Sequence, residues 1–426
     1  MNILVIGGGG REHAIIKSLR KSPRCGQIWA LPGNGGIAAD AECAPVAATD
    51  LDGVCAFAAA HPVDFAVVAP DDPLALGLVD RLHALGIPCF GPNAAAARIE
   101  ASKSFAKELM RKYHIPTAEY ALFSDYEQAV AYVREKGAPI VVKADGLALG
   151  KGVTVAQTVE EAVAALKRAM LDKAFGASGD TVLIEECLVG PEVTVLAFTD
   201  GHTLVPMVAS MDHKRAQDGD RGPNTGGMGV IAPNPFYTPE IAQRCLNEIF
   251  LPTVRGMAAD GHPFKGCLYF GLMLTAKGPK VIEYNCRFGD PEAQAVLPLL
   301  DGDLLEIMEA VEEERLDQVK VSFRPGASCC LVLASAGYPG HYDKGLPITD
   351  ATDPADPDIT VFHAGTKLAD GQVVTNGGRV LAVTAVADDL PSAVAKSYAA
   401  AENISFANKY FRNDIGRAAL TALERK

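Results

Sequence analysis

The first hundred residues alternate short apolar runs with amphipathic segments, and this alternation constrains the fold more than any other feature of the chain. Runs such as NILVIG and VDFAVVAP predict buried strands, and the intervening segments, such as REHAIIKSLRKS, predict helices. Strands separated by single helices form a parallel sheet with helices on both faces. We therefore predict an N-terminal α/β domain over residues 1–101, with a ligand site at the carboxyl ends of its strands.

The pattern changes after residue 101. Strand and helix patterns surround a glycine-rich loop through residues 118–188, which predicts a small α+β subdomain that could act as a mobile lid. A larger mixed region follows as far as residue 326. Residues 327–426 combine short strands, glycine turns and one late helix, which predicts a mixed, β-rich C-terminal domain. We thus expect three domains, 1–101, 102–326 and 327–426.

The charge of the chain excludes some functions. The net charge is −13, which argues against binding to nucleic acids or anionic membranes, whose partners carry basic surfaces. The N-terminal apolar run lacks a preceding basic segment and a cleavage site, and no apolar stretch reaches the roughly 18 residues of a membrane span. The ten cysteines form no C-x-x-C pair, so we expect reduced thiols in a cytoplasmic protein.

The loop IGGGGREHA follows the first predicted strand, where a dinucleotide-binding fingerprint would lie. The third glycine of that fingerprint would fall on Glu12 or His13, and the acid that should end the second strand is absent. The loop still suits a single phosphate, because backbone N–H groups at a helix N-terminus lie beside Arg11. A tight strand–helix turn without a ligand is the alternative.

Two further glycine loops are candidates for phosphate and substrate binding. LALGKGV is not a Walker A loop, since Asp145 and Gly152 occupy positions that require Gly and Ser or Thr. It could instead form a lid that carries Lys143 and Lys151 over a polyphosphate; two solvated lysines at a turn are the alternative. GPNTGGMG, preceded by MDHKR, indicates substrate binding, or else a mobile surface loop.

The segment VIEYNCRFGDPEAQ ends a predicted strand with several polar groups. Glu283 and Asn285 lie two residues apart and so share one face, where two oxygen ligands suit Mg²⁺ completed by water and phosphate. Arg287 shares that face and offers a planar fork for a phosphate or a carboxylate. The alternative is an edge strand with solvated polar side chains. The strand VLIEECL could offer backbone groups to an adenine, with Glu192 accepting from ribose hydroxyls.

Together these motifs resemble the ATP-grasp superfamily and, within it, the phosphoribosylamine–glycine ligase family. Matching segments span the chain in family order: GGGGREHA, SKSFAK, VVKADGLALGKGV, DHKR with GPNTGGMG, RFGDPEAQ, GYPG, HAGTK, GGRVLAV and FRNDIG. One departure is APDDP, where the family commonly has a Gly-Pro-Glu core. Asp71 replaces that glutamate with a shorter carboxylate, which affects the expected affinity for the sugar rather than the reaction type.

The resemblance implies an N-terminal pre-ATP-grasp domain, an ATP-grasp fold with a lid, and a ligase of purine biosynthesis. ATP, glycine and 5-phosphoribosylamine would give ADP, phosphate and glycinamide ribonucleotide through a glycyl phosphate. ATP, with Mg²⁺ or Mn²⁺, is the implied cofactor, and the two small molecules are the implied partners. The same assignment implies no nucleic-acid partner and no membrane partner; the acidic charge mildly favours a monomer.

The resemblance also implies a role for individual residues. The ATP site would comprise Lys103, Lys143, Gly150, Lys151, Gly152, Glu185, Glu186, Leu188 and Glu192. The metal ligands would be Glu283 and Asn285, and the catalytic groups Arg287, Lys143, Asp212 and Lys214. Substrates would contact Gly9, Arg11, Asn34, Asp71, Asn224, Thr225, Gly226, Gly227, Arg287, His363, Thr366 and Arg379.

Two rival hypotheses remain. Another ATP-grasp carboxylate–amine ligase or a purine-pathway carboxylase would share the ATP residues and differ in its substrate loops. A non-catalytic nucleotide-binding regulator would not need Glu283 and Asn285 as metal ligands and would show no turnover.

Overall fold

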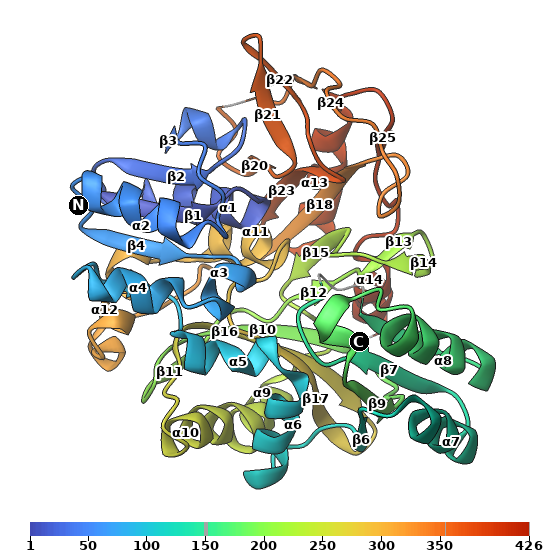
Figure 1. The fold of residues 1–426 in the computed structure, drawn as a ribbon. Helices are drawn as coiled ribbons and strands as arrows, with labels where there is room; N and C mark the ends of the chain where they lie inside the picture. Colours follow the sequence, from blue (N-terminus) through green and yellow to red (C-terminus); the bar gives the residue numbers. More distant parts are fainter. Residues whose placement is uncertain (149–151, 354, 426) are drawn as a thin grey trace.

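The computed structural model describes residues 1–148, 152–353 and 355–425. Its N-terminal part is a five-stranded parallel sheet in the order β3-β2-β1-β4-β5 (Figure 1). The strands are β1 (Ile3–Gly7), β2 (Ile28–Pro32), β3 (Glu42–Cys43), β4 (Phe65–Val68) and β5 (Cys89–Phe90). From β1 the chain first adds β2 and β3 on one side, and it then crosses to add β4 and β5 on the other side. The loops after β1 and β4 therefore border the crevice where such sheets bind ligands.

Helices cover this sheet on both faces, as the alternation of apolar runs predicts. Ile3 and Val5 of β1 pack in one buried cluster with α1 (Gly10–Leu19), and Leu4 and Ile6 pack in another with α2 (Leu51–Ala60) and α4 (Leu78–Ala84). All of β1 is buried, which is why the run reads as continuously apolar. The short helix α3 (Asp71–Ala75) begins directly after the β4 loop.

Two helices lead out of the N-terminal sheet: α5 (Ala94–Ala101) and α6 (Lys103–Lys112). They are separated by Ser102, whose extended backbone ends α5 and whose side chain accepts the N–H of Phe105 as the N-cap of α6. This cap places Lys103 and Lys107 on α6, one turn apart.

The predicted lid is a four-stranded antiparallel sheet in the order β6-β9-β7-β8. Its strands are β6 (Tyr120–Phe123), β7 (Ile140–Ala144), β8 (Val153–Ala156) and β9 (Val182–Glu186), and its helices are α7 (Tyr126–Lys136) and α8 (Val159–Leu166). The buried cluster beneath these helices, which includes Val133 and Ile184, draws only on residues of this region. A core of its own allows such a unit to move as a body.

A second antiparallel sheet, in the order β11-β10-β16-β17, forms the middle of the molecule. It contains β10 (Glu192–Asp200), β11 (Leu204–Pro206), β16 (Lys265–Thr275) and β17 (Gly278–Asn285). The helices α9 (Pro239–Cys245), α10 (Leu251–Ala259), α11 (Glu292–Val296) and α12 (Leu304–Glu312) also belong to this region. A bulge leaves Ile282 of β17 unpaired, because Val281 pairs with Leu272 and Glu283 pairs with Gly271.

The third large sheet runs β12-β15-β18-β23-β20 and joins two separate parts of the sequence. Its first strands are β12 (Met211–Asp212) and β15 (Gly229–Ala232). The others are β18 (Ala327–Ser335), β23 (Arg379–Ala387) and β20 (Ile359–His363), with β25 (Lys409–Tyr410) paired to β18. Helix α13 (Leu390–Glu402) packs on this sheet, and α14 (Arg417–Glu424) ends the described chain. Residues before and after position 326 thus share one sheet.

The described residues also contain three two-stranded antiparallel sheets: β13 (Arg215–Gln217) with β14 (Arg221–Asn224), β21 (Thr366–Ala369) with β22 (Gln372–Thr375), and β19 (Thr349–Asp350) with the distant β24 (Ile404–Ser405). Within the described ranges, no helix has the length and apolar character needed to cross a membrane.

Candidate functional site

The carboxyl end of β17 places the predicted metal ligands at the centre of the molecule. The Lys214 Nζ lies 3.3 Å from Oε1 of Glu283 and 3.6 Å from Oε2 of Glu192. The charge of Lys214 lowers the pKa of Glu283 to about 2, so this carboxylate is ionised at neutral pH. Asn285 adds a second oxygen from the same end of the strand. A hard cation could use both oxygens.

These two oxygens fit Mg²⁺ only with help from other ligands. No group of three or more His, Cys, Asp or Glu side chains in the described parts of the chain could hold a metal ion. A cation at Glu283 and Asn285 would therefore take its remaining ligands from water and from phosphate oxygens, which is how Mg²⁺ binds at nucleotide sites. The donor set thus suits a metal bound together with a polyphosphate.

Arg287 is fixed by a carboxylate that sequence reasoning missed. Oε1 of Glu100 lies 2.8 Å from the Arg287 Nη2, and Oε2 of Glu100 accepts the N–H of Cys286 at 2.7 Å. Nη2 also donates to Oδ1 of Asn285 at 3.0 Å, while Nε of Arg287 is buried without a hydrogen-bond partner. Burial raises the pKa of Glu100, and the Arg287 charge opposes that rise. The only sign of this role in the sequence is that Glu100 is an acid within the alanine-rich segment AAAARIEA.

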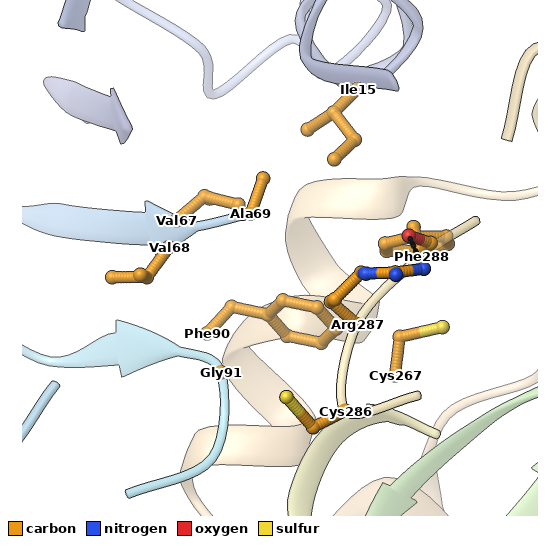
Figure 2. A pocket seen from close by; sticks show the side chains of 10 residues that line it. All are labelled: Ile15, Val67, Val68, Ala69, Phe90, Gly91, Cys267, Cys286, Arg287 and Phe288. Atoms are coloured by element: carbon orange, nitrogen blue, oxygen red, sulfur yellow. Dashed lines mark hydrogen bonds between the residues drawn. The ribbon is translucent and has the colours of Figure 1, made fainter. Parts of the chain in front are cut away.

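A small apolar cavity joins Arg287 to the crevice of the N-terminal sheet. Figure 2 shows its lining: Ile15, Val67, Val68, Ala69, Phe90, Gly91, Cys267, Cys286, Arg287 and Phe288. Val67, Val68 and Ala69 mark the end of β4, and the guanidinium of Arg287 lies against the carbonyl of Phe288, which accepts from its Nη1 at 3.3 Å. The charged group therefore has apolar walls on one side. Such walls exclude water and strengthen its field.

Two buried lysines meet at Glu185: Lys143, which belongs to the predicted ATP site, and Lys107, which does not. The carboxylate oxygens of Glu185 lie 2.8 Å from the Lys143 Nζ and 3.1 Å from the Lys107 Nζ, and all three side chains are buried. Lys143 also donates to the carbonyl of Ile282, the residue left unpaired by the β17 bulge, at 3.0 Å. Burial lowers the pKa of Lys107 to about 8. Lys107 belongs to SKSFAK, yet it received no role from the sequence.

The remaining ATP residues are spread around this trio. Lys103 donates to the carbonyl of Gly146 at 3.0 Å, and burial lowers the pKa of Lys103. Glu186 is held by Lys280. Leu188 follows β9, Glu192 opens β10, and Gly152 accepts the N–H of Ala144 at 2.9 Å. Gly150 and Lys151 lie outside the described residues.

Asp212 lies at the end of β12 and has a buried oxygen, Oδ1, without a hydrogen-bond partner. Burial raises the pKa of Asp212 well above its usual range, and the nearby charge of Glu292 adds to the rise. Burial likewise raises the pKa of Glu292. The positive charge of Lys214 acts in the opposite direction and lowers the pKa of both acids. Because the site is enclosed and rich in acids, Asp212 and Glu292 would gain from a cationic ligand group. The sequence left Glu292 without a role.

The loop Asn224–Gly227 is held by Lys214 and Arg379, which lie far apart in the sequence. The N–H and Oγ of Thr225 each donate to the carbonyl of Lys214 at 2.8 Å. Arg379, at the start of β23, donates through Nη1 to the carbonyls of Gly226 at 2.9 Å and Asp290 at 2.6 Å. Gly227 has a φ of +115°, and a Cβ there would lie 2.7 Å from Oδ1 of Asp212. The loop therefore lies directly against the acidic corner.

The predicted phosphate loop of the N-terminal domain is connected to the same region. The N–H of Gly9 donates to Oε2 of Glu12 at 2.5 Å. Arg11 is buried, its Nε lies 2.6 Å from Oε1 of Glu12, and its Nη1 donates to the carbonyl of Phe288 at 3.2 Å. Asp71 opens α3 after the β4 loop, and its charge contributes to the raised pKa of Arg287, which burial opposes. The structure thus brings Gly9, Arg11 and Asp71 toward Arg287.

Asn34, His363 and Thr366 lie at a junction on the other side of this loop. The Asn34 amide nitrogen donates to the carbonyls of Gly8 at 2.9 Å and His363 at 2.8 Å, and its oxygen accepts the N–H groups of Gly36 and Ile37. The Asn34 side chain is fully occupied within the protein. Nδ1 of His363 lies 3.2 Å from Oγ of buried Thr366, and burial lowers the pKa of His363 to about 4.

Three models of one family match almost all of the chain. The N domain of phosphoribosylglycinamide synthetase matches residues 1–100, its ATP-grasp (A) domain matches residues 101–293, and its C domain matches residues 328–418. The matches follow the chain in order.

Several known proteins resemble the chain over its whole length. Phosphoribosylamine–glycine ligases of Vibrio vulnificus and Rhizobium meliloti are each 48% identical to it, and the alignments cover 100% and 98% of both chains, respectively. The crystal structure of the Thermotoga maritima phosphoribosylamine–glycine ligase superposes with a TM-score of 0.85 at 33% identity, covering 97% of this chain and 100% of that one. A biotin carboxylase domain of Hydrogenobacter thermophilus 2-oxoglutarate carboxylase shares the fold, with a TM-score of 0.74 at 18% identity, covering 96% and 91%.

Proposed function

Because the chain belongs to the phosphoribosylglycinamide synthetase family, we propose that it joins glycine to 5-phosphoribosylamine in purine biosynthesis, with conversion of ATP to ADP and phosphate. One observation carries the proposal beyond the family. Glu283 and Asn285 lie at the end of β17 with Arg287 just beyond it, and the half-buried acid Asp212 and the cation Lys214 lie close by. Phosphate, carboxylate and ammonium groups could all be held there.

ATP would lie between the lid and the central sheet. Lys103, Lys143 and the loop 150–152 would hold its phosphates, Glu185, Glu186 and Leu188 would border the adenine, and Glu192 would accept from the ribose. Glu283 and Asn285 would hold Mg²⁺ or Mn²⁺, which when bound neutralises charge on the phosphate oxygens. The buried pairing of Lys143 with Glu185 supports this placement, because it fixes the ammonium beside the lid strands.

The first chemical step is attack of the glycine carboxylate oxygen on the γ-phosphorus, which forms glycyl phosphate and releases ADP. Arg287 would stabilise the charge on the transferred group, and Asp212 and Lys214 would orient the glycine under the loop Asn224–Gly227. The amine of phosphoribosylamine then attacks the acyl carbon; the C–N bond forms, phosphate leaves and the amine loses a proton. ATP supplies the activation, so the protein positions the reactants and excludes water.

Phosphoribosylamine would be held where the N-terminal and C-terminal parts of the chain meet. The glycine loop with Gly9 and Arg11 would hold the phosphate at the N-terminus of α1. Asp71 would accept from the sugar hydroxyls, and Arg379 would close the site beside the glycine loop 224–227. Asn34, His363 and Thr366 are the remaining residues proposed for this site. Because the Asn34 amide already makes hydrogen bonds within the protein through both its nitrogen and its oxygen, it would hold the junction rather than the sugar.

Phosphate release tests the proposed reaction. We expect release from ATP and Mg²⁺ to require both glycine and freshly prepared phosphoribosylamine, and to be unaffected by bicarbonate. Turnover that ignores glycine, or that depends on bicarbonate, would contradict the ligase reaction and favour a carboxylase. Absence of turnover together with tight ATP binding would favour a nucleotide-binding regulator.

We also infer that the enzyme works as a monomer in the cytoplasm. The net charge of −13 supports the monomer, because like-charged chains repel one another. Sedimentation at increasing protein concentration checks this, and a mass of about twice 44.8 kDa would contradict it.

A further inference from the structure

His13, in the first turn of α1, is buried and uses both of its ring nitrogens. Its Nε2 lies 3.0 Å from Oδ2 of Asp40, and its Nδ1 accepts the backbone N–H of His363 at 2.8 Å. A backbone N–H can only donate, so Nδ1 carries no proton. The ring proton is therefore on Nε2, where it is donated to Asp40. These two contacts define one neutral tautomer.

The backbone of His363 is held on two sides by the N-terminal domain. His13 accepts its N–H, and Asn34 donates to its carbonyl at 2.8 Å. Asn34 also donates to the carbonyl of Gly8, in the glycine loop between β1 and α1. The end of β20 is thus tied to the helix and to the loop that are proposed to hold the phosphate of the substrate.

The packing around His363 leaves little room for another arrangement. A Cβ added at Gly36 would lie 2.2 Å from a ring carbon of His363. The N–H of Gly35 donates to the carbonyl of Thr366 at 3.3 Å, and Oγ of Thr366 lies 3.2 Å from Nδ1 of His363. His363 and Thr366 consequently take their positions from the same contact with the N-terminal domain.

We propose that His13 is a positioning residue for phosphoribosylamine, whose neutral ring fixes His363 and Thr366 over the glycine loop. The inference rests on the proposed function, because that function supplies the ligand. The two ring nitrogens then differ in importance. Nδ1 holds the backbone of His363 by accepting its N–H at 2.8 Å. Within the described residues, Nε2 contacts only Asp40. That carboxylate is partly exposed, and its Oδ2 also lies 3.0 Å from the Nζ of Lys17.

Two substitutions separate the nitrogens. In His13→Asn the amide oxygen can replace Nδ1 as the acceptor for His363, whereas in His13→Gln the longer amide can replace only Nε2 as the donor to Asp40. We expect the KM for phosphoribosylamine to stay near the wild-type value in His13→Asn and to rise about tenfold in His13→Gln, as loss of one buried hydrogen bond implies. kcat and the KM for ATP should stay within about twofold in both, since ATP binds elsewhere.

Three kinetic results would overturn the inference. They are equal KM values for phosphoribosylamine in the two variants, a KM for ATP that rises as much as that for phosphoribosylamine, or a larger effect in His13→Asn. A wild-type chain without phosphoribosylamine-dependent turnover would instead overturn the proposed function and the inference together. A measurement that needs no variant is ¹⁵N NMR of the labelled histidines in the wild-type chain. The inference requires the neutral Nε2–H tautomer of His13 at neutral pH and fails if the proton is on Nδ1.

Discussion

Glu283 is the residue whose removal tests the chemistry most directly. Its carboxylate is ionised, faces Lys214, and is the only acid among the proposed metal ligands. Glu283→Gln keeps the shape and removes the charge, and we expect kcat to fall at least about 10²-fold, as loss of a charge-stabilising group does. Steady-state kinetics over a range of Mg²⁺ concentrations measures this. Near-wild-type kcat at saturating Mg²⁺ would remove Glu283 from the metal site.

Asp71 tests the sugar site, where the chain departs from the pattern of the family. Asp71→Ala removes a carboxylate whose charge acts on Arg287 and which is not among the proposed ATP-binding residues. We expect a KM for phosphoribosylamine at least about tenfold higher, since the hydroxyls lose a charged acceptor, with the KM for ATP unchanged. An equal loss in both KM values would indicate a general folding defect instead.

The half-buried ring of His363 makes the free energy of unfolding depend on pH. Burial lowers the pKa of His363 to about 4 in the folded chain, from an ordinary value of 6.5. Between these two values the unfolded chain binds more protons than the folded chain, so the free energy of unfolding falls as the pH drops from 6.5 to 4. One such group contributes a slope approaching about 1.4 kcal/mol per pH unit. His363→Gln should reduce the slope in urea titrations, whereas replacing exposed His341 should not; equal slopes for His363→Gln and wild type would contradict the assignment.

The glycine loop 224–227 supplies a test at the scale of the element. Gly227 has a φ of +115°, and a Cβ there would lie 2.5 Å from Cδ of Pro291 and 2.7 Å from Oδ1 of Asp212. Gly261 also has a positive φ, +79°, but no heavy atom lies within 4 Å of its added Cβ. We expect both alanine variants to lose about 1–2 kcal/mol of stability through backbone strain, and Gly227→Ala to lose more because its Cβ collides with Pro291 and Asp212. Only Gly227→Ala should also lose most of its activity; equal activities would show that the loop does not depend on this close approach.

Binding of ATP between the lid and the central sheet should stabilise the whole molecule, and this stabilisation can be measured. ATP with Mg²⁺ binds only the folded chain, so a concentration of 100 times its Kd should raise the free energy of unfolding by about 2.7 kcal/mol. Chelation of the metal should remove most of this gain, and the gain should also be small in Glu283→Gln. Thermal unfolding with and without EDTA measures both effects. An undiminished gain with EDTA would show that nucleotide binding does not use the metal site.

Local patterns predicted most of the fold. Continuous apolar runs such as NILVIG and VDFAVVAP correctly predicted β1 and β4 of the N-terminal sheet, and REHAIIKSLRKS predicted α1, whereas the two-residue strand β3 and the short helix α3 were not predicted. An apolar core beneath residues 123–184 is consistent with the predicted lid. Local patterns did not show that β12 and β15 extend the sheet of the C-terminal strands, because pairing between distant segments leaves no mark on the period of either segment. The site residues were predicted from motifs, and their functional roles stay predictions.

The sequence by itself placed Glu283 and Asn285 two residues apart on one strand, with Arg287 just beyond its end, and the order of its motifs indicated the family. These properties depend on neighbours in the chain. Only the tertiary structure decided which partners fix the site residues: Glu100 on the side chain of Arg287, Lys107 on that of Glu185, and His13 on the backbone N–H of His363. Each of these contacts joins residues more than 70 positions apart. Their distances depend on how helices and sheets pack, which no local spacing records.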